Sequence, residues 1–374
     1  HHAKGRGQQQ PLVDWCNWAR GVPSTDHNLG HTLQHFWDSK PVLVTGGASF
    51  IGSHLVERLV SLGAIVRVVD DFSSGRLENL STVSDQIEIV EGDLKSNAVA
   101  AKAVTGQNTV FHLAASHGGR GYIETHPADC ATNLALDTIV FEASNQAGVE
   151  RVCFASSACV YPKNIQQHKT LLQEDMVSLD VPGGAFSDAE YGWAKLMGEM
   201  TLKAFHRQHG LKCSSVRYFT AYGPRCNESH AIIAFIAKAL SCQSPFNIWG
   251  DGKQTRNFTY VDDIVEATLL AAEKIEDGTA VNAGTSNFNS IEDVARLVCK
   301  MMDYLPEQGF SFSNDKPTGP LHRAADTSRA ELLMGWKPSY GLEQGVVKTI
   351  DWYTRHANAK TLAGGELEKR LMDR

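Results

Sequence analysis

Short apolar runs alternate with amphipathic segments from residue 41 onward, and this alternation predicts the fold. Runs rich in β-branched residues, each followed by a turn, indicate strands at 41–45, 64–70, 87–93, 109–115 and 151–157. Helical periodicity marks segments at about 50–63, 127–146, 189–208, 230–241 and 262–275. Nearly continuous apolar strands that alternate with helices are typical of a parallel sheet covered on both faces. We therefore expect an α/β protein built on a doubly wound parallel sheet.

A glycine-rich turn joins the first predicted strand to the first helix. The segment "TGGASFIG" occupies residues 45–52, and Asp70 ends the next strand eighteen residues after Gly52. Such a turn lets the N–H groups of a helix N-terminus face phosphate, and an acid at this distance reaches a ribose 2′-hydroxyl. A plain tight turn is the alternative, but the complete pattern predicts a dinucleotide site. The carboxylates of Asp70 and Asp71 would repel a 2′-phosphate, which favours NAD over NADP.

Tyr191 and Lys195 lie one turn apart on a predicted helix, which Ser187 and Glu190 would open as a capping box. A free tyrosine has a pKa near 10 and is a poor base at neutral pH, but a neighbouring ammonium group favours the phenolate. A nearby serine hydroxyl would complete the proton path. This spacing is common by chance in amphipathic helices. Together with the dinucleotide motif, it favours a catalytic pair.

Charge and cysteine content exclude several classes of protein. The formal net charge is −7 and the pI is near 6.1, so there is no basic footprint for nucleic acid. No apolar run approaches the ~18 residues that span a membrane, and the first residues lack the apolar core of a signal peptide. The eight cysteines include no Cys-x-x-Cys pair, which favours free thiols over disulfides or zinc. We expect a cytoplasmic protein with no metal and with neither nucleic acid nor membrane as partner.

From about residue 41 to 355 the chain resembles the extended short-chain dehydrogenases/reductases of the NAD-dependent nucleotide-sugar epimerase/dehydratase family. Besides the motifs above, the resemblance rests on "EGDL" at 91–94, "HLAA" at 112–115 and "WGDGKQTRNFTYVDD" at 249–263. Ser49 departs from the family, which has its middle glycine at that position. The resemblance implies a Rossmann domain that binds NAD, a nucleotide-diphosphate sugar as substrate, and a homodimer that pairs through two long helices.

Position within the family places the cofactor contacts on the glycine turn, on the ends of the following strands and beside the catalytic pair. Asp71 alone is as well explained as a solvated loop acid. The predicted contacts are Gly46, Ser49, Phe50, Ile51, Gly52, Asp70, Asp71, Phe72, Ser73, Asp93, Leu94, Leu113, Ala114, Ala115, Tyr191, Lys195 and Tyr218.

The stretch "SSACVYP" at 156–162 carries the predicted chemistry. Family register makes Ser157 the catalytic hydroxyl, with Ser156 as the runner-up. Related dehydratases carry Asp and Glu just after this hydroxyl. GDP-mannose 3,5-epimerases and GDP-fucose synthases instead have a cysteine at the Cys159 position, where it removes a proton from a sugar carbon. His230, in "NESHAIIAF", resembles the catalytic histidine of the fucose synthases. A core cysteine and a helix-end histidine are the alternatives.

The resemblance implies an epimerase that acts through transient oxidation at C4. Tyr191 would take the C4 hydroxyl proton while NAD accepts the hydride. Cys159 and His230 would then remove and replace a proton at C3 and/or C5 before the hydride returns. A plain 4-epimerase, which needs neither Cys159 nor His230, is the nearest alternative. A net reductase or dehydrogenase and a non-catalytic NAD-binding scaffold are two others.

The resemblance also implies how the substrate is held. Arg256 and Arg323 would contact the diphosphate, since a guanidinium group donates paired hydrogen bonds to phosphate; a surface ion pair is the alternative for each. The loop at 117–124, which carries His117, would touch the sugar or simply be solvated. The predicted substrate contacts are Gly118, Gly119, Arg120, Ser156, Ser157, Thr220, Arg256 and Arg323. We interpret the other cysteines as structural: Cys16, Cys130, Cys153, Cys213, Cys226, Cys242 and Cys299.

The predicted domain organisation follows the change of pattern along the chain. Residues 1–40 show no period and contain Trp15, Trp18 and Trp37, which we expect to pack on the main body or on a partner. The expected parts are this extension at 1–40, a Rossmann domain at 41–217 plus about 259–284, a smaller mixed α/β substrate-binding lobe at about 218–258 plus 285–357, and a tail at 358–374.

Overall fold

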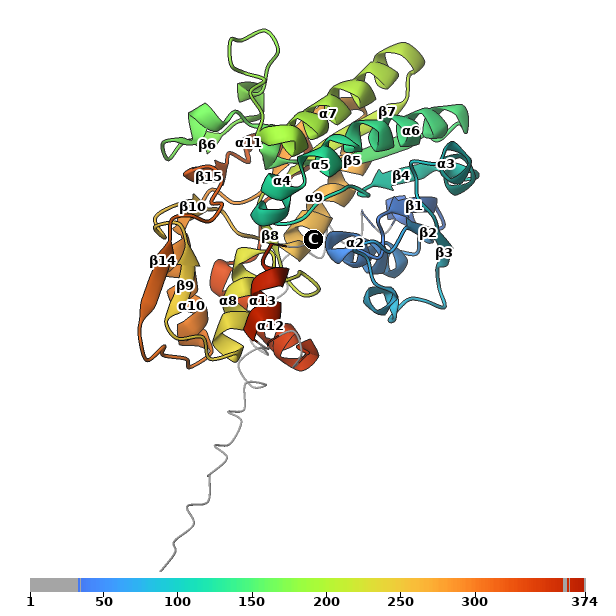
Figure 1. Ribbon diagram of the computed structural model, residues 1–374. Helices are drawn as coiled ribbons and strands as arrows, with labels where there is room; N and C mark the ends of the chain where they lie inside the picture. Colours follow the sequence, from blue (N-terminus) through green and yellow to red (C-terminus); the bar gives the residue numbers. More distant parts are fainter. Residues whose placement is uncertain (1–32, 34, 359–361, 363, 373–374) are drawn as a thin grey trace, which may run out of the picture.

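A central sheet of seven parallel strands forms the body of the protein (Figure 1). The computed structural model describes residue 33 and the ranges 35–358, 362 and 364–372, so Trp15, Trp18 and Cys16 lie outside the described residues. The strand order is β12-β7-β5-β4-β1-β2-β3, and every pair is parallel. The strands are β1 (Pro41–Thr45), β2 (Ile65–Asp70), β3 (Glu88–Glu91), β4 (Thr109–His112), β5 (Arg151–Ser157), β7 (Lys212–Tyr218) and β12 (Asp277–Ala283). The predicted doubly wound fold is confirmed.

Helices cover both faces of this sheet because successive strand side chains point in opposite directions. Val42 and Val44 of β1 join one core cluster, while Leu43 between them joins another. The first cluster packs under α2 and α9, and the second under α3, α6 and α7. The helices on this body are α2 (Phe50–Ser61), α3 (Asn97–Val104), α4 (Arg120–Thr125), α5 (Pro127–Ala131), α6 (Asn133–Gln146), α7 (Ala189–His209) and α9 (Val261–Lys274).

The start of α7 differs from the predicted capping box. The N-cap residue is Asp188, and its side chain makes no capping hydrogen bond. The Ser187 hydroxyl instead donates to the carbonyl of Val160, at 3.0 Å. The capping-box prediction was therefore wrong, because tertiary contacts at this helix end replace the local ones.

A second, smaller region beside the body contains short strands and helices. Its four-stranded sheet has the order β13-β10-β15-β6, and two further pairs are β11-β8 and β14-β9. These strands are β6 (Leu171–Leu172), β8 (Ala221–Tyr222), β9 (Phe246–Trp249), β10 (Thr255–Arg256), β11 (Thr259–Tyr260), β13 (Asn289–Ser290), β14 (Phe310–Ser313) and β15 (His322–Ala325). Its helices are α8 (Ala231–Leu240), α10 (Ile291–Met301), α12 (Leu342–His356) and α13 (Gly364–Arg370), whereas α11 (Ser328–Met334) packs on α9 and β12 of the body. Short 3₁₀ helices complete the fold: η2 (Leu77–Leu80), η3 (Ala158–Val160), η4 (Lys163–Gln166) and η5 (Glu174–Met176).

Trp37 packs on the main body, as expected for the last tryptophan of the 1–40 segment. Its side chain is fully buried, and its ring lies 5.3 Å from that of Phe111 in β4. No disulfide joins the cysteines of the described residues. Within the same residues, every helix is too short or too polar to cross a lipid bilayer.

Candidate active site

A cavity of about 1420 Å³ opens at the carboxyl ends of the central strands and extends to the second region. Open α/β sheets bind their ligands at this edge. The predicted site residues line this cavity, with two exceptions, Gly52 and Phe72. Gly52 lies within α2, and Phe72 packs against the hydrophobic core with a φ of +55°. The structure therefore brings together residues from segments more than 150 positions apart, as the sequence analysis expected.

Ser49 closes the glycine turn instead of disturbing it. Its hydroxyl donates to the carbonyl of Gly46 at 2.6 Å and accepts from the N–H of Gly52 at 3.3 Å, so Ser49 is the N-cap of α2. The Ser49 φ of −76° is open to any residue, whereas Gly46 has a φ of +65°. A Cβ atom on Gly52 would lie 2.1 Å from the Gly46 carbonyl oxygen. The first and last glycines are thus required by the backbone, while the middle position is not.

Asp70 is fixed at the end of β2, where the sequence placed the ribose-binding acid. One carboxylate oxygen accepts from the N–H of Ala48 at 3.0 Å, and the other from the N–H of Phe72 at 2.9 Å. The side chain borders the cavity although it is only 7% exposed. Each carboxylate oxygen has a second lone pair, so this group could still accept from ribose hydroxyls.

Tyr191 and Lys195 face the cavity from α7, close to Ser157 at the end of β5. Burial raises the pKa of Tyr191 well above its ordinary value, and a hydrogen bond with Ser157 opposes this shift. Lys195 Nζ donates to the carbonyl of Ala155 at 2.7 Å and lies 5.8 Å from the Tyr191 ring centroid. Burial also lowers the pKa of Lys195. The ammonium group therefore lies beside a phenol that needs help to ionise.

The two adjacent serines of β5 point in different directions. Ser156 is buried and its hydroxyl donates to the Glu199 carboxylate, which forms a buried ion pair with Arg217 at 2.8 Å. The Ser157 side chain instead faces Tyr191 and accepts from the N–H of Cys159 at 3.1 Å. Of the two hydroxyls, Ser157 is therefore the one placed to serve the tyrosine.

Cys159 lies against a guanidinium group. Its side chain is buried, and Arg323 Nη1 donates to its Sγ at 3.6 Å. Arg323 is fixed by two further contacts: Nε donates to Gln166 Oε1 at 2.8 Å, and Nη2 lies 3.4 Å from Asp188 Oδ2. Arg323, which was predicted to contact the diphosphate, thus also touches the predicted base.

Asp188 is the shared counter-ion of the cationic side chains on this side of the cavity. Arg120 donates to both carboxylate oxygens, at 3.2 and 2.6 Å, and Lys163 Nζ lies 3.1 Å away. Burial raises the pKa of the Asp188 carboxyl, but the neighbouring Arg120, Arg323 and Lys163 hold it well below its usual range. One buried carboxylate therefore balances three cations that come from distant segments.

Arg256 lacks such a partner. Its guanidinium donates to the carbonyls of Thr255 and Thr318 at 2.7 and 2.6 Å, and none of the ion pairs within the described part of the chain involves it. Burial, followed by the charges of Arg323 and Arg120, lowers the pKa of Arg256 to about 9. A bound anion would relieve this unbalanced charge, so Arg256 could hold a phosphate group.

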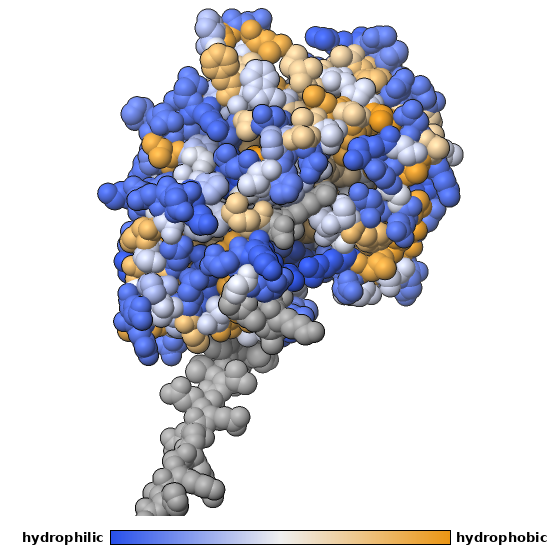
Figure 2. Space-filling view, in the orientation of Figure 1, coloured by the Kyte–Doolittle hydropathy of each residue, from blue (hydrophilic) through white to orange (hydrophobic). Residues whose placement is uncertain are grey.

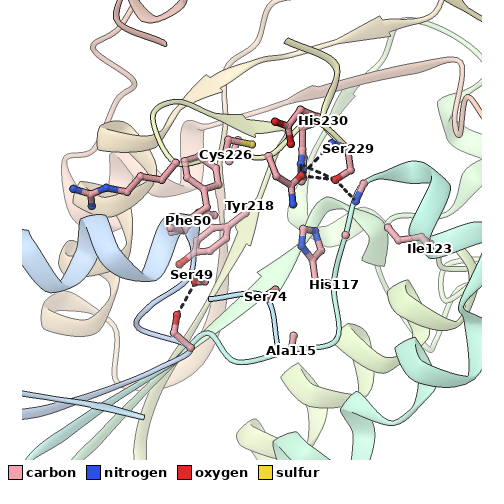
Figure 3. A pocket seen from close by; sticks show the side chains of 18 of the residues that line it. Ser49, Phe50, Ser74, Ala115, His117, Ile123, Tyr218, Cys226, Ser229 and His230 are labelled. Carbon is pink, nitrogen blue, oxygen red and sulfur yellow. Dashed lines mark hydrogen bonds between the residues drawn. The ribbon is translucent and has the colours of Figure 1, made fainter. Parts of the chain in front are cut away.

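His230 opens α8 on another wall of the cavity, with its ring held by its own loop (Figure 3). Its Nδ1 lies 3.1 Å from Asn227 Oδ1 and 3.3 Å from the Ser229 hydroxyl. Burial lowers the pKa of His230 to about 4. The centroid of the His117 ring lies 5.3 Å from that of Tyr191 and 5.8 Å from that of His230.

The sequence analysis missed a group of residues that line the far end of the cavity. They belong to α8 and its preceding loop and to the last two helices, and they include Arg225, Asn227, Glu228, Lys238, Trp352, Tyr353, Glu366 and Arg370. Residues 358–374 had been expected to form only a tail, but part of this segment folds as α13. The apolar spacing of Leu367 and Leu371, both buried, is the signal that could have indicated a packed helix.

Known proteins resemble the chain over most of its length. The family model "NAD dependent epimerase/dehydratase family" matches residues 42–284. A UDP-glucose 4-epimerase of Mycolicibacterium smegmatis is 31% identical over 83% of this chain and 97% of its own. A GDP-mannose 3,5-epimerase of Arabidopsis thaliana is 28% identical over 89% of this chain and 88% of its own.

Solved structures agree with the sequence comparisons. A Thermus thermophilus UDP-glucose 4-epimerase in complex with NAD has a TM-score of 0.72 and 26% identity, over 85% of this chain and all of its own. The expected extended short-chain dehydrogenase/reductase fold, the NAD cofactor and an enzyme of the epimerase class are therefore confirmed. The chain belongs to the NAD-dependent epimerase/dehydratase family.

Proposed function

We propose that the protein is an NAD-dependent epimerase of a nucleotide-diphosphate sugar that inverts C3 and/or C5 through transient oxidation at C4. The observation that carries this proposal is the Cys159 thiol. It lies in the same cavity as Tyr191 and 3.6 Å from a guanidinium nitrogen of Arg323. A plain 4-epimerase has no use for a thiol in this place.

The first step needs a base at the C4 hydroxyl. NAD, when bound, accepts a hydride from C4 and later returns it. Tyr191 takes the hydroxyl proton, supported by the ammonium group of Lys195 and the hydrogen bond with Ser157. The contacts of Ser157 support its role over that of Ser156, whose hydroxyl is committed to Glu199. The resulting ketone makes the hydrogens on the neighbouring carbons acidic.

The second step exchanges one of those hydrogens. A thiolate is the reactive form of cysteine, and an adjacent cation favours it. The guanidinium group of Arg323 contacts the Cys159 Sγ, and this contact supports the proposal that Cys159 removes a proton from C3 or C5. His230, which lines the same cavity from the start of α8, is the proposed source of the proton for the opposite face. Hydride return then gives an epimer with no net change of the cofactor.

The substrate would be held by charge. Arg256, with its two backbone contacts and no acidic partner among the described residues, is the proposed diphosphate ligand, together with Arg323. The sugar would face Thr220 and the loop around Gly118 and Gly119, which line the same cavity. The predicted cofactor contacts other than Gly52 and Phe72 line the same cavity.

A homodimer in the cytoplasm is part of the proposal. Leu134 of α6 and Trp193 and Met197 of α7 are more than 40% exposed although they are large apolar side chains. Hydrophobic surface gathers in the upper part of the molecule, where these helices lie (Figure 2). Apolar patches of this kind mark interfaces between subunits. A monomeric mass by light scattering at micromolar concentration would contradict the dimer.

A 4-epimerase is the second candidate, because a UDP-glucose 4-epimerase is as similar to this chain as a GDP-mannose 3,5-epimerase. An incubation of the enzyme with GDP-mannose and with UDP-glucose in deuterated water distinguishes the two candidate functions. Deuterium at C3 or C5 of either sugar, located by NMR, supports our proposal. Inversion at C4 without label supports the 4-epimerase and contradicts the thiol mechanism.

A further inference from the structure

We propose that His117 is a further catalytic residue of this site, which forms with His230 a histidine pair that gives the proton to the sugar carbon. This inference rests on the proposed function and deepens it. Its starting point is position. His117 follows β4, is exposed and lines the cavity, and its ring neighbours those of both Tyr191 and His230. Figure 3 shows His117 below His230, on the facing loop.

The hydrogen bonds of the neutral His230 ring leave its Nε2 atom as a hydrogen-bond acceptor, with no proton to give. Asn227 Oδ1 accepts from the backbone N–H of Ser229 at 3.1 Å, which identifies this atom as the amide oxygen. The Ser229 hydroxyl donates to the same oxygen at 2.5 Å, so the hydrogen of the neutral His230 ring is assigned to Nδ1, which lies 3.1 Å from that oxygen. In the neutral ring, Nε2 is then left as an acceptor. An acid that acts repeatedly has to be supplied with a proton from elsewhere.

The burial of His230 also means that its ring must receive a proton before it can act as an acid. The pKa of His230 is lowered to about 4, so the neutral ring dominates at pH 7. His117 differs in being exposed to the cavity, where water can reach it before the substrate closes the site. Its ring centroid is 5.8 Å from that of His230, a separation that one water or a small ring rotation bridges. A proton can thus reach the pair through His117.

The two loops that carry these histidines are joined to each other. The N–H of Gly119 donates to the Ser229 hydroxyl at 3.2 Å. A Cβ atom on Gly119 would lie 2.0 Å from the Ser229 carbonyl oxygen, so only glycine permits this approach. His117 and His230 therefore keep a fixed relation although they come from different regions of the fold.

The proton balance closes without another reactant. Cys159 thiolate takes the proton from the carbon beside the ketone, and an enolate forms. The protonated histidine pair gives its proton to the same carbon from the other side, so a C–H bond forms and the ketone is restored. The thiol is then protonated and the pair neutral. Water takes one proton from the thiol and returns one to His117.

The test compares His117→Gln with His126→Gln. His126 also contacts a tyrosine ring, that of Tyr122, with centroids 4.3 Å apart, but it does not line the cavity. Each variant is incubated with GDP-mannose and with UDP-glucose in deuterated water. Bound NAD and the transient absorbance of the reduced nicotinamide are measured in parallel.

We expect His117→Gln to keep its NAD and its C4 oxidation but to slow inversion at C3 or C5 by ~10²-fold or more, the usual loss for a general acid. Cys159-dependent exchange into the starting sugar should continue, and His126→Gln should behave as the unaltered enzyme. Imidazole added to His117→Ala should restore part of the inversion rate, which a merely structural role would not allow.

Two results would overturn the inference alone: inversion at the unaltered rate in His117→Gln, or a parallel loss of C4 oxidation, which would mean that His117 only positions Tyr191. If the unaltered enzyme inverts C4 and incorporates no label, the proposed function fails, and the histidine pair fails with it.

Discussion

The cofactor end and the sugar end of the cavity are formed by different kinds of contact. At the cofactor end, the main contacts come from backbone: Ser49 bonds to Gly46 and Gly52, and Asp70 accepts two backbone N–H groups. These contacts are local, spanning fewer than thirty residues. At the sugar end, side chains meet side chains across the whole chain, as in the contact of Arg323 with Cys159.

This difference separates binding from chemistry. A site made of backbone tolerates changes of side chain, as the serine in place of the family's middle glycine illustrates. A site made of charged side chains depends on each partner, because a buried charge that loses its counter-ion is costly. We therefore expect substitutions at the sugar end to change the reaction, and substitutions at the cofactor end that leave its backbone conformation unchanged to have small effects.

The largest expected effect is that of Cys159→Ala, compared with Cys153→Ala. Both thiols are buried near β5, but the Cys153 Sγ donates to the carbonyl of Thr268, away from the cavity. Cys159→Ala should abolish deuterium exchange at C3 and C5, a loss of ~10²–10⁴-fold, and should keep NAD binding and C4 oxidation. Cys153→Ala should cost stability only. Normal exchange in Cys159→Ala would contradict the thiol mechanism.

The next effect separates the adjacent serines. Ser157→Ala should lower C4 oxidation by ~10²-fold, because it removes the hydrogen bond with Tyr191. Ser156→Ala should keep its activity and lose about 1–2 kcal/mol of unfolding free energy, because Glu199 loses one buried donor. Turnover rates and urea denaturation measure the two effects. Equal losses of activity would show that our assignment of the hydroxyls is wrong.

A smaller effect should appear in the pH dependence of stability. The pKa of His230 is about 4 in the folded protein and near 6.5 in an unfolded chain. Between these values the unfolded chain binds more protons, so stability is lost as the pH falls from 6.5 toward 4, by at most about 3 kcal/mol. Denaturation midpoints at several pH values should therefore converge for the unaltered protein and His230→Gln as the pH falls. Parallel curves would contradict the shift.

The smallest expected effect is at the cofactor end. Ser49→Gly removes an N-cap hydroxyl and should cost a few tenths of a kcal/mol, with NAD affinity within about twofold of the unaltered protein. Ser96→Gly is the matched control, because Ser96 caps α3 and does not itself line the cavity. A loss of NAD affinity greater than tenfold in Ser49→Gly alone would show that the Ser49 hydroxyl contacts the cofactor.

The same contrast explains how far the sequence could be interpreted. The cofactor end was predictable because its residues follow one another within a single strand–turn–helix–strand unit. The strands β7 and β12 were not identified, since polar residues such as Ser214, Ser215 and Asn282 are buried within them and hide the apolar pattern. The role of Asp188 was missed because its partners Arg120 and Arg323 lie 68 and 135 positions away.

Gly119 has a consequence for how variants of this protein are judged. In a saturation mutagenesis screen, positions that tolerate no substitution are usually taken for reactive residues. Gly119 should score among them, and so should Gly192, where a Cβ atom would lie 2.1 Å from the Cys159 carbonyl oxygen. Neither has a side chain that could act on a sugar. Their intolerance would report the close approach of the segments that carry the reactive groups, so a fitness map alone would overstate the number of residues that do chemistry.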